Sequence, residues 1–144
     1  MGHRLIHGAS ESCALPHGHN ELVTVRLNAT TPARLDGLGN MAISFQRAKG
    51  TWHRFVDEKL DHALQLAQDD PLLDWFLVHE PARARRIVVT PGDPTTELMA
   101  CLLMAKINAF LKHEGGVLHC TELSLQETPT NTVCFSGDPE EFIP

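Results

Sequence analysis

The chain has 144 residues and a formal net charge of −6, because 18 Asp and Glu outnumber 12 Lys and Arg. This acidic balance argues against a nucleic-acid partner, since such a protein needs a cationic face to displace counterions. A hydrophobic content of 42% is sufficient for the core of one compact domain, and we assign residues 1–144 to a single domain.

Targeting and redox signals are weak in this sequence. No apolar run approaches the roughly 20 residues of a membrane-spanning helix, and no basic-plus-apolar leader is present. The four cysteines, at positions 13, 101, 120 and 134, are too widely spaced to suggest a disulfide framework. We therefore expect a cytoplasmic protein without a membrane segment.

The first predicted elements are a strand and a long helix. Residues 17–30 alternate as a strand does, and one face is predicted to carry His17, His19, Glu21, Val23, Val25 and Leu27. A loop rich in turn residues follows at 31–32 and 35–40. A helix is then predicted from residue 45 to about 60, with Ser44 as its N-cap and Gly50 as an unfavourable interior residue.

The middle of the chain predicts short elements and then a second long helix. Residues 68–73 form a turn that leads to a short helix, and residues 86–90 form a short strand. Segment 91–97 offers capping oxygens and an acidic first turn, so a long helix starts there and runs to about residue 112, before a pair of glycines. Its apolar side is predicted to carry Leu98, Cys101, Leu102, Ala105 and Phe110.

The C-terminal part predicts a β-hairpin. One face is expected to carry Val117, Thr121, Leu123 and Leu125. Residues 129–131 make the turn and residues 132–135 return. The order strand, helix, helix, strand, strand predicts an α+β protein, with two helices packed on one face of an antiparallel sheet.

One short segment gathers groups that bind metals and transfer protons. Within seven residues it places the Cys13 thiol and the His17 and His19 imidazoles. Residues two apart on a strand project from one face, so these two histidines can bind one ion together. With His3 or His7 as a third ligand they would form a zinc site with an open position, which is the catalytic pattern. The alternative is a turn with two surface histidines.

Four further side chains have both a functional and a structural interpretation. Cys13 is a thiolate base beside a divalent cation, a fourth ligand that closes a structural site, or simply a buried thiol. Asp61 orients the His62 imidazole for proton transfer, or both belong to a solvated helix end. Glu127 continues the inward face of a strand, so its carboxylate needs ligand N–H donors, unless the strand has already frayed there.

Taken in order, these residues resemble the 6-pyruvoyltetrahydropterin synthase / 6-carboxytetrahydropterin synthase family. Five landmarks carry the resemblance and span nearly the whole chain: His3-Arg4-Leu5, Cys13-Ala14-Leu15-Pro16-His17-Gly18-His19-Asn20, Leu60-Asp61-His62, Asp93-Pro94-Thr95-Thr96-Glu97 and Gln126-Glu127-Thr128. The three residues between Cys13 and His17 resemble the bacterial carboxy-forming branch, because animal pyruvoyl-forming members usually have a longer gap.

The resemblance implies the tunnelling fold (T-fold), in which small α+β subunits pair their sheets into an oligomeric barrel. A homohexamer, as a dimer of trimers, is the assembly implied. By the same resemblance, His3, His17 and His19 would bind Zn2+, and Cys13 would be one acid/base group.

The resemblance also implies the remaining site residues. His62, oriented by Asp61, would be the second acid/base group, and Glu127 would anchor the pterin ring through its amino group and ring N–H. Three more residues would help to recognise the pterin, from a neighbouring subunit: Thr95, Thr96 and Glu97.

The activity implied is that of a zinc-dependent lyase. It would convert 7,8-dihydroneopterin triphosphate to 6-carboxy-5,6,7,8-tetrahydropterin, acetaldehyde and triphosphate, in queuosine and 7-deazapurine biosynthesis. The alternatives are pyruvoyl-forming activity on the same substrate and a diverged homologue that binds zinc or a pterin without turnover. Three departures from the family pattern bear on this choice: Glu21 replaces an aromatic residue, Ser44 replaces an aspartate, and only Met1 and Gly2 precede His3.

Overall fold

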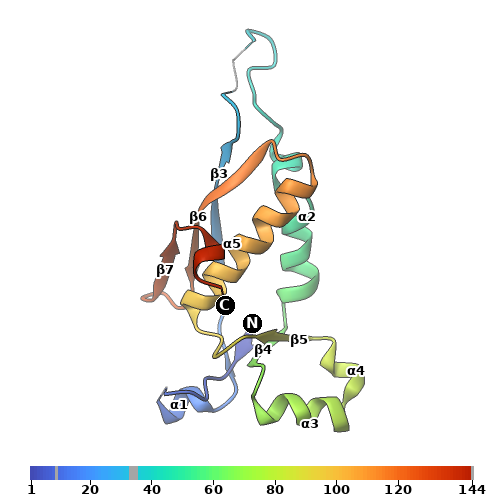
Figure 1. Cartoon of the computed structure of the whole chain (residues 1–144), viewed down its shortest axis with the longest axis vertical. Helices are drawn as coiled ribbons and strands as arrows, with labels where there is room; N and C mark the ends of the chain where they lie inside the picture. Colours follow the sequence, from blue (N-terminus) through green and yellow to red (C-terminus); the bar gives the residue numbers. More distant parts are fainter. Residues whose placement is uncertain (9, 33–35, 144) are drawn as a thin grey trace.

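The computed structural model of the chain describes residues 1–8, 10–32 and 36–143. Its strands form one sheet of four strands and one sheet of three strands. Figure 1 shows the three-stranded sheet and two long helices as an elongated body, with the four-stranded sheet at its lower end. Residue 35 of the predicted loop lies outside the described residues.

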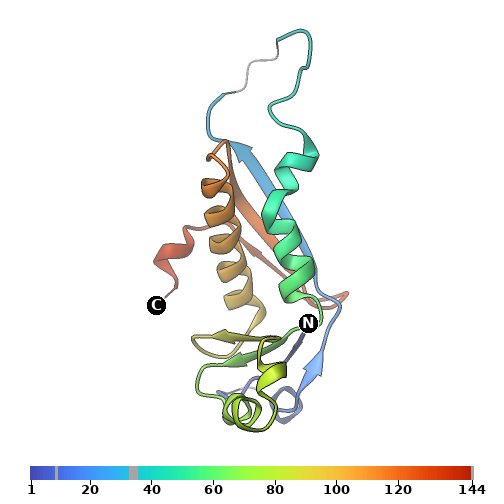
Figure 2. The same cartoon turned by 90° about the vertical axis from the view of Figure 1, so that its right-hand side faces the viewer.

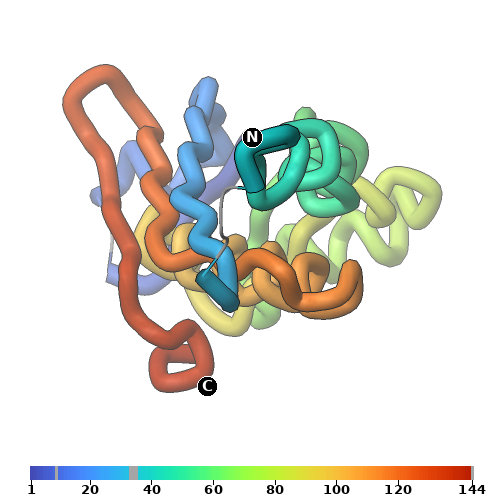
Figure 3. The backbone as a smooth tube through the Cα atoms, turned by 90° about the horizontal axis from the view of Figure 1, so that it is seen from above, coloured from blue at the N-terminus to red at the C-terminus, as the bar shows by residue number. Residues whose placement is uncertain are grey.

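The three-stranded sheet has the antiparallel form that the sequence predicts. β3 (Leu22–Ala29) pairs with β6 (Leu118–Gln126), and β6 pairs with β7 (Thr132–Phe135). Helices α2 (Phe45–Phe55) and α5 (Thr96–His113) lie side by side against one face of β3 and β6 (Figure 2). Viewed from above, both helices lie to one side of this sheet (Figure 3).

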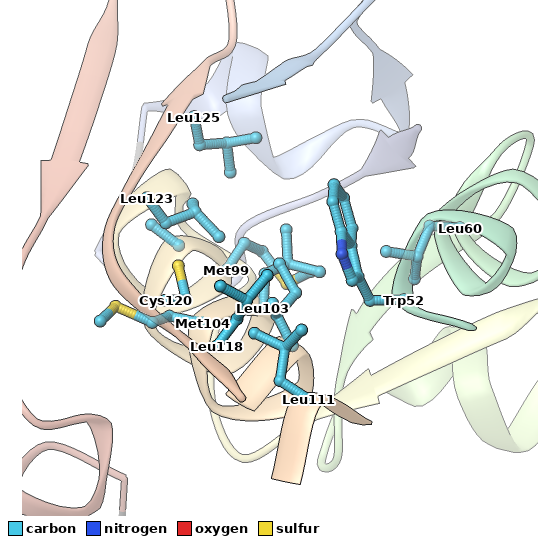
Figure 4. Close-up of a cluster of buried hydrophobic side chains, with 12 residues drawn as sticks. Trp52, Leu60, Met99, Leu103, Met104, Leu111, Leu118, Cys120, Leu123 and Leu125 are labelled. Carbon is cyan, nitrogen blue, oxygen red and sulfur yellow. The ribbon is translucent and has the colours of Figure 1, made fainter. Parts of the chain in front are cut away.

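The main core lies between these two helices and β6. Leu123 and Leu125 are 0% and 1% exposed, and burial of one leucine side chain stabilises a fold by about 1.5–3 kcal/mol. They pack in a cluster with residues of α2, the turn after it, α5 and β6 (Figure 4): Trp52, Leu60, Met99, Ala100, Leu103, Met104, Ile107, Leu111, Leu118 and Cys120.

Two details of this packing differ from the predictions. On α5, only Cys101 of the five predicted inward residues is buried, because the helix is apolar on most sides and its period does not select a face. On β6, the register shifts opposite Arg26 and Leu27. The buried positions are therefore odd-numbered at Leu123 but even-numbered at Cys120. A β-bulge reverses which side chains face the core, and Val117 and Thr121 therefore do not share the face of Leu123.

The four-stranded sheet was not predicted as a unit. It contains β1 (Gly2–His3), β2 (His17–Gly18), β4 (Leu64–Ala67) and β5 (Ile87–Thr90). The sequence predicts β5 as a strand and β2 as part of a longer one, but neither β1 nor β4. β1 pairs antiparallel with β2 and parallel with β4, and β4 pairs parallel with β5. The strand predicted over residues 17–30 is divided into β2 and β3, although inward and outward residues still alternate from 17 to 27.

The helix boundaries agree well with the sequence. Ser44 caps α2 by accepting a hydrogen bond from the Arg47 amide, and the π-helical turn η1 (Val56–Leu60) extends the helix to Asp61. The shorter helices are α1 (Glu11–Ala14), α3 (Pro71–His79), α4 (Pro81–Ala84) and η2 (Pro139–Glu141). In the part of the chain that the structure describes, no helix has the length and apolar character to span a bilayer.

Candidate metal centre and active site

Two very short strands bring the first two histidines together. β1 and β2 pair with His3 directly opposite His17, and His19 follows two residues later. The ring centroids lie 4.6 Å apart for His3 and His17, 5.2 Å for His3 and His19, and 5.1 Å for His17 and His19. One nitrogen of each ring lies within 4.8 Å of the others. The structure thus gathers the three predicted metal ligands into one cluster.

The hydrogen bonds of two of these rings leave nitrogens free to bind a metal. The Nδ1 atom of His3 lies 3.2 Å from the Pro94 carbonyl oxygen. The Nδ1 atom of His17 lies 2.8 Å from the Leu15 carbonyl oxygen. A carbonyl only accepts, so each Nδ1 carries the proton and each Nε2 has a lone pair. The two Nε2 atoms are 3.1 Å apart, close to the roughly 3.3 Å between ligands of tetrahedral zinc. Because such lone pairs repel unless a cation lies between them, the donor set fits zinc.

Burial supports the same protonation state. His3 is 4% exposed, and burial, together with the neighbouring His17, lowers its pKa below the ordinary 6.5. The neutral imidazole that a metal requires is therefore favoured at neutral pH. His7, the other possible third ligand, lies outside the cluster, because its two ring nitrogens contact Asp93 and Asp69.

The three imidazoles line a cavity of about 630 Å³. Five other residues with a predicted role line it as well: Cys13, Thr95, Thr96, Glu97 and Glu127. None of the described residues that line this cavity is Lys or Arg. A metal ion on the histidines would therefore be the main positive charge in the cavity, facing two carboxylates.

The short helix α1 carries Cys13 to the cavity wall. The Cys13 carbonyl oxygen accepts a hydrogen bond of 2.8 Å from the Leu5 amide, and the Cys13 sulfur accepts one of 3.2 Å from the Ser10 hydroxyl. The compact cluster of ligand atoms in the described chain consists of the three histidines and does not include this sulfur. The arrangement therefore favours an open metal site with Cys13 beside it over a closed structural site.

Glu127 lies at the edge of the histidine cluster, directly after β6. Its Oε1 atom is 3.7 Å from Nε2 of His3 and 3.9 Å from Nε2 of His19, and its side chain is 19% exposed. The carboxylate is thus partly buried, as its position on the strand predicts. It has a cavity in front of it into which an N–H donor of a ligand can fit.

Glu21 is a further acidic group near the site, and in the sequence it is notable only as a departure from the family pattern. Leu22 pairs with Gln126, so the register places Glu21 opposite Glu127 on the adjacent strand. Its Oε2 atom is buried without a hydrogen-bond partner. Burial raises the pKa of Glu21 above 4.5, and the charge of Glu127 raises it further.

Asp61 and His62 lie in a different hollow. The His62 Nδ1 atom is 2.8 Å from Oδ2 of Asp61, so the predicted pair is formed, but 87% of the His62 side chain is exposed. Gly2 and Gly18 line this hollow. His19 lines this hollow as well as the cavity of the histidine cluster, whereas Cys13 and Glu127 line only the cavity. Within one chain, Asp61 and His62 are therefore not among the residues that line the cavity with Cys13.

The start of α5 reaches the cavity of its own chain. Thr95 caps the helix by accepting a hydrogen bond of 3.3 Å from the Leu98 amide, and Pro94 contacts His3. Thr95, Thr96 and Glu97 consequently line the same cavity as the histidines, and no neighbouring subunit is needed to bring them there.

These features define an α+β protein with a cluster of three histidines that could bind a metal ion, in a cavity that also contains a thiol and carboxylates. A family model described as 6-pyruvoyl tetrahydropterin synthase matches residues 1–138. The chain belongs to this family, which confirms the family, and with it the class of enzyme, that the sequence motifs predict.

Two similar proteins have a more particular name, 6-carboxy-5,6,7,8-tetrahydropterin synthase. The protein of Rickettsia felis is 32% identical over 134 residues, which are 93% of this chain and 89% of that protein. The protein of Rickettsia conorii is 32% identical over 136 residues with the same two coverages.

Solved structures support the fold. An uncharacterized protein from Wolinella succinogenes superposes with a TM-score of 0.73 at 22% identity, covering 94% of this chain and 92% of that one. The 6-pyruvoyl tetrahydropterin synthase of Plasmodium vivax superposes with a TM-score of 0.61 at 20% identity, covering 93% and 87%.

Proposed function

We propose that the chain is a zinc-dependent carbon–carbon lyase that converts 7,8-dihydroneopterin triphosphate and water to 6-carboxy-5,6,7,8-tetrahydropterin, acetaldehyde and triphosphate. The observation that supports it best is the meeting of three imidazoles, the Cys13 thiol and the Glu127 carboxylate at one cavity. The names of the relatives at 32% identity favour the carboxy-forming reaction. The product would then serve queuosine and 7-deazapurine biosynthesis, and the subunits would form a homohexameric barrel.

Each group would have one task. Zinc on His3, His17 and His19 would polarise the side-chain hydroxyls of the substrate. Glu127 would accept hydrogen bonds from the pterin amino group and ring N–H, and so orient the side chain toward the histidines. Cys13 would take up a proton from the substrate side chain at its sulfur, which the Ser10 hydroxyl orients.

The second proton-transfer group would come from another subunit. His62 donates through Nδ1 to Asp61, so its Nε2 atom is free to exchange protons. In one chain, however, this pair lies in a neighbouring hollow and does not line the cavity that contains Cys13 and Glu127. We therefore assign the His62 that serves each cavity to a second copy, in keeping with an oligomeric family.

The decisive experiment is incubation of the zinc-loaded protein with 7,8-dihydroneopterin triphosphate and identification of the products by mass. We expect 6-carboxytetrahydropterin and acetaldehyde, and no product from Cys13→Ala. Cys134→Ala is the matched control, because this exposed cysteine on β7 does not line the cavity.

A 6-pyruvoyl product would instead assign the pyruvoyl-forming reaction to this cavity. Unchanged substrate with a sample shown to contain zinc would overturn the catalytic proposal and favour a protein that binds zinc or a pterin without turnover.

A further inference from the structure

The segment between β1 and α1, which leads to Cys13, is hydrogen-bonded to two loops of the four-stranded sheet. β4 and β5 run parallel, so their carboxyl ends meet at one edge of this sheet. Asp69 and Asp70 follow β4, and Asp93 follows β5. All three carboxylates bind residues of the segment between β1 and α1, which lies at the lower end of the molecule in Figure 1.

Asp93 binds this segment most extensively. Its Oδ1 accepts a hydrogen bond of 2.8 Å from the Ile6 amide, and its Oδ2 accepts one of 2.7 Å from the His7 amide. Oδ1 also lies 3.1 Å from Nδ1 of the His7 ring. Burial would raise the pKa of Asp93, but these hydrogen bonds lower it below 3.8, so the carboxylate is charged at neutral pH.

His7 bridges two carboxylates. Nδ1 faces Asp93, and Nε2 lies 3.0 Å from Oδ2 of Asp69. Carboxylates only accept, and a neutral imidazole has a single N–H, so both contacts are hydrogen bonds only when the ring is protonated. The hydrogen bond to Asp93 and the charges of both carboxylates accordingly raise the pKa of His7 above 6.5.

The charges nearby also favour a protonated His7 ring. Arg4 forms a bidentate ion pair with Asp70, with Nε 2.7 Å from Oδ2, and so neutralises this one carboxylate. Among the ion pairs of the described residues, Asp69 and Asp93 have the His7 ring as their partner. A neutral ring would leave two negative charges unbalanced at this edge.

A short path links His7 to Cys13. Leu5 lies between Arg4, which Asp70 holds, and Ile6, which Asp93 holds. The Leu5 amide donates to the Cys13 carbonyl oxygen at 2.8 Å, and Leu5 itself lines the cavity. The anchored residues therefore flank a backbone hydrogen bond that holds Cys13 at the cavity wall, in addition to the bond from the Cys13 amide to the Ser10 carbonyl oxygen.

We propose that His7 and Asp93 are positioning residues for Cys13, and that they hold its loop firmly only while His7 is protonated. The consequence for turnover rests on the proposed function, but the anchoring of the loop does not. Because the folded-state pKa of His7 is raised, its contribution is complete below pH 6.5 and is lost as the pH rises through the raised value. Deprotonation leaves one of the two ring contacts without a proton.

Amide hydrogen exchange tests the anchoring without any need for substrate. Protection factors of residues 4–13, referred to the intrinsic rate at each pH, are measured at about pH 6 and pH 9 on the wild type, His7→Gln and His79→Gln. We expect wild-type protection to fall about ten-fold with rising pH, the order expected when one charge-assisted hydrogen bond is lost. His7→Gln should be low and independent of pH, while His79→Gln, a change at an exposed histidine of α3, should follow the wild type.

The result that overturns the proposal is wild-type protection that does not change with pH, or His7→Gln with full protection at pH 6. A 15N spectrum of the imidazoles is a second readout, since His7 must show two protonated nitrogens at pH 6 and only one at pH 9. If the enzyme turns over, His7→Gln should lower kcat more than it raises KM and flatten the alkaline side of the pH profile. If it does not, the exchange result still decides the anchoring.

Discussion

Gly50→Ala is the substitution whose effect on stability the structure defines most sharply. Gly50 lies inside α2 with φ of 40° and ψ of −144°, so the helix is interrupted there. A Cβ atom at this position would lie 2.5 Å from Oε2 and 3.0 Å from Oε1 of Glu114. That carboxylate accepts hydrogen bonds from the amide and the hydroxyl of Thr51, and so caps the second half of the helix.

The cost has two parts. A side chain in this backbone conformation strains it by about 1–3 kcal/mol, and displacement of the Glu114 carboxylate removes a cap worth about 0.5–2 kcal/mol. We therefore expect Gly50→Ala to lower the free energy of unfolding by about 1.5–5 kcal/mol, a large share of the roughly 5–15 kcal/mol of a typical domain.

Urea unfolding at one fixed protein concentration measures this loss, since oligomerisation makes stability depend on concentration. Two further experiments separate the backbone strain from the loss of the Glu114 cap. Gly115→Ala adds strain alone, because Gly115 has φ of 105° with nothing within 4 Å of its Cβ position. In a Glu114→Ala background, Gly50→Ala should cost only the strain. A Gly50→Ala protein within about 0.5 kcal/mol of wild type would refute the reasoning.

Three other predictions test the site and the acid sensitivity of the fold. The double variant His17→Ala, His19→Ala should lose bound zinc by atomic absorption, and retention of stoichiometric metal would remove the assignment. Thr51 hydrogen bonds lower the pKa of Glu114 below 4.5, so their stabilisation is present above pH 4.5 and is lost as the pH falls through the lowered value; Glu114→Gln should show a shallower acid limb in urea. Mixed refolding of inactive Cys13→Ala and His62→Ala should restore about a quarter of wild-type activity if subunits share sites, and none if they do not.

The sequence predicts elements whose signals are local. Ser44 and Thr95 have the side chains and the spacing of helix caps, and both cap a helix in the structure. The alternation of residues 17–27 is also real, since inward and outward residues alternate throughout. The spacing of His17 and His19 predicts a shared ligand role, while the choice of His3 as third ligand and the role of Glu127 come from the family resemblance. The structure brings all four residues to one cavity.

Other features depend on contacts that no local pattern contains. β1 and β2 have two residues each, too few for a period to be visible. The shift in register near Leu27 and Cys120 depends on the pairing of β3 with β6 across a long stretch of chain. Asp93 contacts His7 across a sequence separation of 86 residues, so its role as an anchor is visible only once β4 and β5 are side by side.

The position of the three-histidine cluster also links metal binding to folding. Two-residue strands are too short to be stable by themselves, yet β1 and β2 carry His3 and His17. An ion held by both, and by His19, would therefore cross-link the ends of this ribbon, and its binding energy would add to the stability of the segment. Cys13 lies between these histidines in sequence and is tied to Leu5. Binding of an ion would thus order the three histidines and the segment that leads to Cys13 together, and Asp70 and Asp93 bind residues of this same segment.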